Sequence, residues 1–280
     1  MAYKTILAHC NDKARVARVA SVAAQLASRY SAHLIGLSVS PPVHLIPAGM
    51  PATPDVIVDD ARRLAYRQEI SDLRHTFLET SRAHGIAAEW RERDADSASL
   101  ARLVVAAARR ADLVVLAQKD PAWPSSVYLD VDDAVIMGAG RPVLLVPNNG
   151  SASASARRVM VAWSDTREAS RAVFDALPLL QQAEDVRVVS IGADEPDASL
   201  QECDLDICAA LVRHKVKCRA TERIATHADV GRSLTEQAIA QKADLLVMGC
   251  YGHSRLREFV LGGTSRYQLR HMIIPVLMSH

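Results

Sequence analysis

The chain repeats itself, and this repeat limits the fold more than any other feature of the sequence. The segment RRADLVVLA at 109–117 corresponds to QKADLLVMG at 241–249, and RPVLLVP at 141–147 corresponds to IPVLMSH at 274–280. A chain of 280 residues is long enough for two domains of ordinary size. We therefore expect the same structural unit twice.

Each unit alternates apolar strands with helical stretches. TILAHCND at 5–12 and RVMVAWSDT at 158–166 are apolar runs that pass into polar turns, and an Ala-containing stretch with helical spacing follows each. Strands that are apolar nearly throughout and alternate with helices indicate a parallel sheet covered on both faces. The sequence therefore predicts an α/β fold of two doubly wound parallel-sheet domains in tandem.

The residues from Asn148 to Ala156 are rich in Gly, Ser and Asn, which is typical of a flexible connector. We place the two domains on either side of it, at 1–148 and 157–280.

Composition argues against several other classes of protein. A formal charge of +1 and only three Phe do not suit a nucleic-acid-binding surface. No apolar run is long enough to cross a bilayer, and the N-terminal segment lacks the features of a secretory signal, so we expect a cytoplasmic protein without membrane contact. The five cysteines form no C-x-x-C pair, so neither a disulfide framework nor a zinc site is predicted.

A glycine-rich loop gives the strongest functional signal. It follows the apolar strand ADLLVM at 243–248 and precedes YQLRHM, which indicates the start of a helix. Its first glycines are Gly249 and Gly252, and its second glycine cluster consists of Gly262, Gly263, Thr264 and Ser265. Glycine lets the backbone approach a ligand closely, and a helix N-terminus offers free N–H groups that favour phosphate. The alternative interpretation is that these glycines only permit tight turns.

The spacing G-x2-G-x9-G followed by small hydroxyl residues resembles the ATP-binding loop of the universal stress protein family. GHSRLREFVLGGTSR resembles the C-terminal copy of bacterial tandem members, and VAWSDTREASRAV resembles their usual opening. The resemblance extends across the whole chain. It implies Rossmann-like, adenine nucleotide alpha hydrolase-like domains that bind ATP or another adenine nucleotide, with Mg²⁺ on the phosphates.

The resemblance also implies a role for each matching position. The residues that would hold the phosphates are Gly252, His253, Gly262, Gly263 and Thr264. The ribose and base would lie near Met248 and Gly249, and the adenine would pack on Ile191. The family's first loop reads Asp-Gly-Ser, whereas this chain has Ser164, Asp165 and Thr166, which weakens base selectivity. The expected nucleotide-binding residues are Ser164, Asp165, Ile191, Met248, Gly249, Gly252, His253, Gly262, Gly263, Thr264 and Ser265.

The first half lacks the corresponding loop. When Pro142 is aligned with Pro275, the second glycine cluster corresponds to Leu129, Asp130, Val131 and Asp132, with Asp133 next. A triphosphate there would meet like charge, at a cost on the order of several kcal/mol at an effective dielectric of about 20. We therefore expect a degenerate first domain without nucleotide. The alternatives for these aspartates are a Mg²⁺ or Ca²⁺ site and, more commonly, exposed turn residues.

Three functions remain open. The leading one is a nucleotide-dependent sensor or regulator of the stress response, read by an unidentified protein partner. The second is a slow ATP hydrolase or phosphotransferase, and the third is a nucleotide-independent scaffold or chaperone-like protein. The Walker sequence is absent and His253 is the only candidate general base, so no catalytic residue is assigned and enzymatic activity is not the leading expectation.

The final strands of the two units carry a further prediction. A terminal edge strand has unpaired backbone groups that tend to pair with another strand. RPVLLVP and IPVLMSH are therefore expected to pair with each other and to form a pseudo-dimer within one chain, so that a homodimer would use other surfaces.

Overall fold

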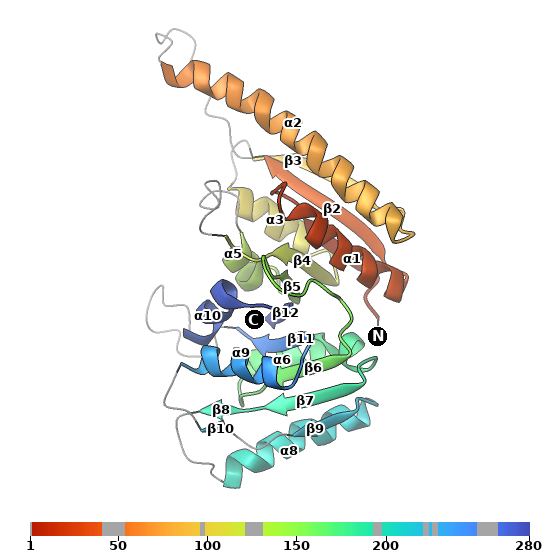
Figure 1. The fold of residues 1–280 in the computed structure, drawn as a ribbon, viewed down its shortest axis with the longest axis vertical. Coiled ribbons are helices and arrows are strands. Elements are labelled where there is room, and N and C mark those ends of the chain that lie inside the picture. The colour runs from red at the N-terminus through yellow and green to blue at the C-terminus, as the bar shows by residue number, and fades with distance from the viewer. Residues whose placement is uncertain are drawn as a thin grey trace.

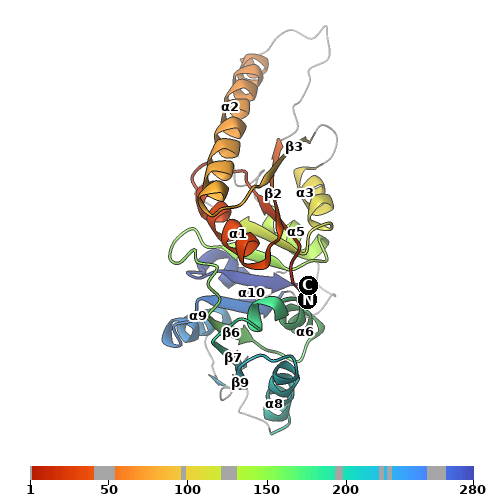
Figure 2. The ribbon, with the colours of Figure 1, turned by 90° about the vertical axis from the view of Figure 1, so that its right-hand side faces the viewer.

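In the computed structural model, the described residues are 2–40, 54–95, 99–120, 131–192, 198–220, 224–225, 229–250 and 263–280. Figures 1 and 2 show two α/β units that lie side by side and share one sheet. None of the described helices combines the length and the apolar character that crossing a membrane requires.

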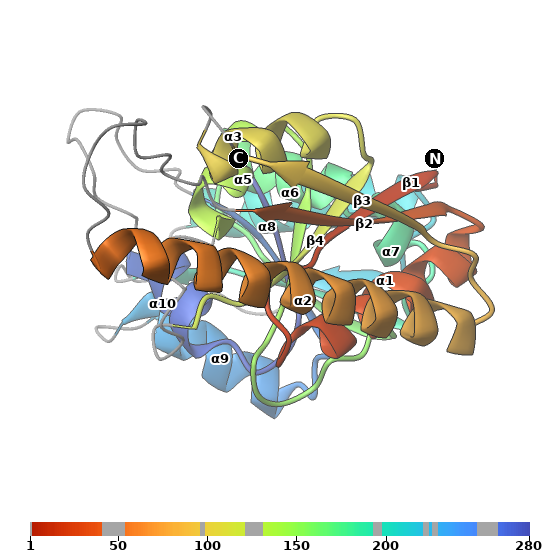
Figure 3. The same cartoon turned by 90° about the horizontal axis from the view of Figure 1, so that it is seen from above.

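The first half runs from β1 to β5. Its elements are β1 (Thr5–His9), α1 (Val16–Tyr30), β2 (His33–Ser40), α2 (Pro54–Ala83), β3 (Glu89–Asp94), α3 (Leu100–Ala108), β4 (Leu113–Ala117), α5 (Asp132–Gly138) and β5 (Val143–Val146). The long helix α2 packs beside α1, as the view in Figure 3 shows.

The second half runs from β6 to β12. Its elements are β6 (Arg158–Ala162), α6 (Arg167–Asp175), α7 (Leu177–Leu180), β7 (Asp185–Val189), β8 (Ile191–Gly192), α8 (Ala198–Arg213), β9 (Cys218–Ala220), β10 (Ile224–Ala225), α9 (Val230–Ala240), β11 (Leu245–Gly249), α10 (Gly263–His271) and β12 (Val276–Ser279).

Ten strands form one continuous sheet in the order β3-β2-β1-β4-β5-β12-β11-β6-β7-β9. Each half has the same order, counted from its own first strand, and every pair within a half is parallel. The predicted fold class is therefore confirmed. The halves meet where β5 pairs antiparallel with β12, with Leu144 opposite Leu277, so the predicted pairing of the two last strands is also present.

The apolar strands are buried on both faces, as their sequences predict. Alternate residues point to opposite sides: Ile6 and Val159 belong to the core under α1, α6, α7 and α8, whereas Leu7 and Met160 belong to the core under α3, α5, α9 and α10. Both cores continue across the junction of the halves, because strands of both halves contribute to each.

The connector between β5 and β6 is packed, which differs from the flexible linker that its composition predicts. Ala154 and Ala156 are buried in the core, and Ser151 N–H donates to the Ile273 carbonyl at 3.0 Å. Arg18 of α1 donates to the carbonyl of Gly150 at 2.9 Å. Small side chains let this segment lie close to both halves, so its composition reflects tight packing.

Candidate functional site

The carboxyl edge of the second half has the geometry that binds ligands in doubly wound sheets. Strand β6 is the first of its half, with β7 on one side and β11 on the other, so the order in which parallel strands are added to the sheet reverses between β6 and β11. Ligands in open parallel sheets bind beyond the strand ends at such a point. Asp165, Ile191 and Gly249 follow or end the strands that meet there.

Hydrogen bonds fix the loop after β6 to the start of α6 and to the end of β7. Thr166 caps α6, because its Oγ1 accepts from the Ala169 N–H at 3.2 Å, and Ser164 Oγ lies 3.2 Å from the same oxygen. Trp163 N–H donates to the Val189 carbonyl at 2.9 Å, which holds the loop beside the end of β7. Ser164 and Asp165 are exposed at this edge, and Ile191 is half-buried.

Gly249 has a packing role that its position in a glycine-rich loop did not reveal. A Cβ atom at Gly249 would lie 2.4 Å from the Ala169 nitrogen and 2.5 Å from the Glu168 carbonyl carbon. Only glycine therefore lets the first turn of α6 cross the end of β11. Its neighbour Met248 is buried in the core.

Glu168 is a carboxylate at this edge that the sequence analysis missed. It is 8% exposed and accepts from Arg167 at 3.0 Å. Burial raises the pKa of its carboxyl group. Hydrogen bonds from its own backbone N–H and from Arg167 lower the pKa by a larger amount, so the net pKa lies below its ordinary value. Its position in the first turn after the Thr166 cap is the signal that could have found it.

Helix α10 begins at the second glycine cluster. Gly263 is exposed, and a Cβ there would meet nothing within 4 Å. Thr264 is half-buried and Ser265 is buried, so among the described members of this cluster Gly263 and Thr264 are open to a ligand. The predicted residues Gly252, His253 and Gly262 lie outside the described residues.

The body of α10 is anchored to α9. Gln268 Nε2 donates to the Gly231 carbonyl at 2.7 Å, and a Cβ at Gly231 would lie 2.5 Å from Tyr267 Cβ. The two helices therefore approach closely, and α10 is held in place relative to α9.

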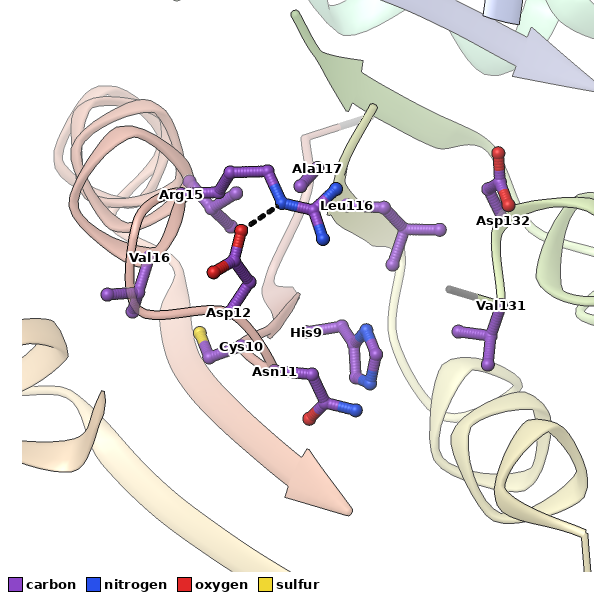
Figure 4. A pocket seen from close by; sticks show the side chains of 11 residues that line it. His9, Cys10, Asn11, Asp12, Arg15, Val16, Leu116, Ala117, Val131 and Asp132 are labelled. Atoms are coloured by element: carbon purple, nitrogen blue, oxygen red, sulfur yellow. Dashed lines mark hydrogen bonds and ion pairs between the residues drawn. The ribbon is translucent and has the colours of Figure 1, made fainter. Parts of the chain in front are cut away.

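The equivalent edge of the first half is filled by Arg15, as Figure 4 shows. The Arg15 guanidinium pairs with the Asp12 carboxylate through Nε, and its Nη1 donates to the Gln118 carbonyl at 2.5 Å. Arg15 is 7% exposed. The remaining cavity measures about 20 Å³, which is room for about one water molecule.

Around this cavity lie buried polar side chains from two segments. His9 ends β1 and Asn11 follows it, and Asp132 begins α5 from the other side (Figure 4). Burial, followed by the charge of Arg15, lowers the pKa of His9 from 6.5 to about 3. Asp132 is 3% exposed, so the interpretation of this residue as an exposed turn aspartate is wrong.

The cation alternative for the first half finds no support in the part of the chain that the structure covers. Within it, no cluster of three or more His, Cys, Asp or Glu side chains is placed to hold a metal ion. Asp130 lies outside the described residues.

The sequence and the structure are similar to those of known proteins. The model of the universal stress protein family matches residues 155–280. No curated protein sequence matches the chain. A universal stress protein from Archaeoglobus fulgidus aligns with a TM-score of 0.70 at 14% identity, over 98% of this chain and 95% of that chain. A putative universal stress protein from Pseudomonas aeruginosa aligns with a TM-score of 0.57 at 15% identity, over 99% and 93% of the two chains.

The structural matches cover both halves, and the family match covers the half with the glycine-rich loop. Each half also has the strand order of the other. Residues 155–280 therefore carry a domain of the universal stress protein family, and the chain as a whole has the fold of that family in tandem.

Proposed function

We propose that the second half binds one adenine nucleotide, with ATP as the first candidate, and that the protein acts as a nucleotide-dependent regulator in the stress response. The observation that carries this proposal is the exposed N-terminus of α10 at Gly263, in the half whose strand order reverses between β6 and β11. Free N–H groups and the positive end of a helix dipole favour phosphate.

The other end of the proposed ligand would lie toward β7. Ile191 follows β7 and gives an apolar, half-buried side chain for the adenine ring. Ser164 and Asp165, exposed after β6, lie between Ile191 and β11 and would meet the nucleoside. Mg²⁺ would accompany the phosphates and neutralise part of their charge.

The first half is proposed to bind no nucleotide. Its equivalent space holds the Arg15–Asp12 pair, and a buried carboxylate, Asp132, stands in the first turn of α5. A phosphate there would have to displace a buried ion pair, which is costly because each charge would lose its partner. We therefore expect one nucleotide per chain.

Calorimetric titration of the nucleotide-free protein with ATP and Mg²⁺ tests the proposal. The informative variant is Gly263→Asp, because nothing lies within 4 Å of a Cβ at this position and an acidic residue suits the first turn of a helix. Its carboxylate would repel a phosphate, so we expect the affinity to fall roughly a hundredfold. Gly263→Ala adds the Cβ without the charge and is the matched control, which should bind within a fewfold of wild type.

One equivalent per chain, weakened by Gly263→Asp and kept by Gly263→Ala, would support the proposal. Two equivalents would contradict the assignment of the first half as empty. Binding that Gly263→Asp leaves unchanged would place the ligand elsewhere, and no binding of ATP, ADP or AMP would favour a nucleotide-independent scaffold.

A further inference from the structure

Two cysteines meet at the outer edge of the second half, far from the candidate site. Cys208 lies on α8, Cys218 begins β9, and their sulfur atoms are 2.8 Å apart. Two other cysteines have different neighbours: Cys10 lies 3.7 Å from the Ala8 carbonyl, and Cys250 lies 3.5 Å from the Met278 sulfur. The pair is therefore a feature of the α8–β9 unit.

The core holds this pair together. Leu211 and Val216 are buried on either side of the turn between α8 and β9, and the Val216 N–H donates to the Leu211 carbonyl at 3.1 Å. Lys215 adopts a left-handed conformation, with φ of 65°, which reverses the chain after the helix. Strand β9 then pairs with β7, with Cys218 opposite Val186. The approach of the two sulfurs follows from a packed turn and a strand register.

The two thiols differ in their access to solvent. Cys208 is buried, whereas Cys218 is half-buried and lines a surface hollow together with Val212 and Arg219. A small reagent in this hollow would reach the sulfur of Cys218 first. Cys208 lies behind it, in position to attack that sulfur once it is modified.

We propose that Cys208 and Cys218 are a disulfide-forming site, oxidised by a small-molecule disulfide of the glutathione type. In the first step Cys218 loses its proton and attacks one sulfur of the reagent, which releases one small thiol and leaves a mixed disulfide. In the second step Cys208 loses its proton and attacks the Cys218 sulfur, which releases the second small thiol. Two protein thiols are oxidised, and one external disulfide is reduced to two thiols that take up the two protons.

The environment sets the character of this site. The hydrogen bond with Cys208, together with burial, raises the pKa of the Cys218 thiol well above its ordinary value. Since only the thiolate attacks a disulfide, exchange is expected to be slow. Because the reduced pair is not stabilised as a thiolate, the closed disulfide resists reduction once it has formed. The bond would link α8 to the outermost strand of the sheet.

The test exposes the native full-length chain to glutathione buffers of graded redox ratio, followed by acid quenching, alkylation, tryptic digestion and mass spectrometry. Arg213, Lys215 and Lys217 separate the two cysteines, so trypsin leaves their peptides joined only by the disulfide. Cys203 shares a tryptic peptide with Cys208, so single Ser variants of Cys203, Cys208 and Cys218 are analysed in parallel. We expect the linked peptide in wild type and in Cys203→Ser, and its loss in the other two variants.

Thermal unfolding gives a second readout. Oxidation should raise the unfolding midpoint of wild type and of Cys203→Ser by about 5 °C, and it should not raise the midpoint of Cys218→Ser. Three results would overturn the proposal: free thiols at every redox ratio, a mixed disulfide on Cys218 that never closes, or a linked peptide that survives in Cys208→Ser. Since none of these readouts involves a nucleotide, the outcome is independent of the proposed function.

Discussion

The side chain of Gln118 donates from Nε2 to the main-chain carbonyl of Leu269 at 3.0 Å, and this bond joins the end of β4 in the first half to α10 in the second. Gln118 Oε1 accepts from the Asn148 N–H at 2.9 Å, and the Gln118 carbonyl accepts from Arg15. Helix α10 runs from Gly263 to His271, so Leu269 lies six residues, about 9 Å along the helix axis, from Gly263. The filled pocket of the first half therefore supports the far end of the helix whose N-terminus faces the candidate site.

Replacement of Gln118 by Leu should destabilise the protein, because it leaves the part-buried N–H of Asn148 and the buried carbonyl of Leu269 without their partner. We expect a loss of about 2 kcal/mol in the free energy of unfolding, measured by urea denaturation. Gln182→Leu, which changes an exposed glutamine, is the matched control. Equal effects of the two substitutions would show that the Gln118 contacts contribute little.

The Asp12–Arg15 pair should show a large coupling in a double-mutant cycle. Arg15→Met leaves a carboxylate at Asp12 in buried surroundings and should cost about 3 kcal/mol, whereas the double variant with Asp12→Asn should cost much less than the sum of the single changes. Glu79 and Arg82 have the same i, i+3 spacing but are exposed, so their cycle should give a coupling below about 1 kcal/mol. Chemical denaturation of the variants measures both cycles, and equal couplings would contradict the buried character of the first pair.

His9 should make the stability depend on pH. Its pKa is about 3 in the folded protein against an ordinary 6.5, so as the pH falls the unfolded chain takes up a proton before the folded chain does. The free energy of unfolding therefore decreases as the pH falls from about 6.5 toward about 3, by about 2 kcal/mol between pH 7 and pH 5. Urea denaturation across this range should show a flatter profile for His9→Gln. His75→Gln, at an exposed ring, should follow the wild-type profile.

The two described glycines of the loop should respond differently to alanine. A Cβ at Gly249 would overlap the first turn of α6, so Gly249→Ala should cost roughly 2 kcal/mol through overpacking. Gly263→Ala meets no neighbour within 4 Å and should leave stability unchanged or raise it by less than about 1 kcal/mol. Thermal and urea unfolding of the two variants measure the difference, and equal losses would contradict the packing role of Gly249.

The repeated fold could be predicted from the sequence because its causes are local. The continuous apolar runs at 113–117 and 245–249 predict strands that are buried on both faces. The last strands of the two halves pair with each other, as their shared sequence indicates. Strand order follows because a parallel sheet with helices on both faces admits few arrangements. The composition of the connector was misleading, because small residues serve tight packing as well as flexibility.

The contacts that fill the first half could not be predicted, because they join residues far apart in the chain. Arg15 lies in the loop between β1 and α1, just before the helix begins, and an arginine in such a loop is usually exposed. The Gln118 carbonyl, to which it donates, follows β4, about a hundred residues later in the chain. Cys208 and Cys218 meet only because the turn at Lys215 and the register of β9 bring them together. The glycines at 249 and 263 look alike in sequence, but only the structure distinguishes tight packing from open space.

The antiparallel pairing of β5 with β12 means that each half always has its neighbour. A partner held by a covalent connector is present at an effective concentration that the connector sets, so dilution of the protein does not separate the two halves. The first half can therefore lose a ligand of its own and still serve the second as a permanent support. A change in the concentration of this protein therefore alters the number of candidate sites, but it does not alter the pairing of the two halves that supports each one.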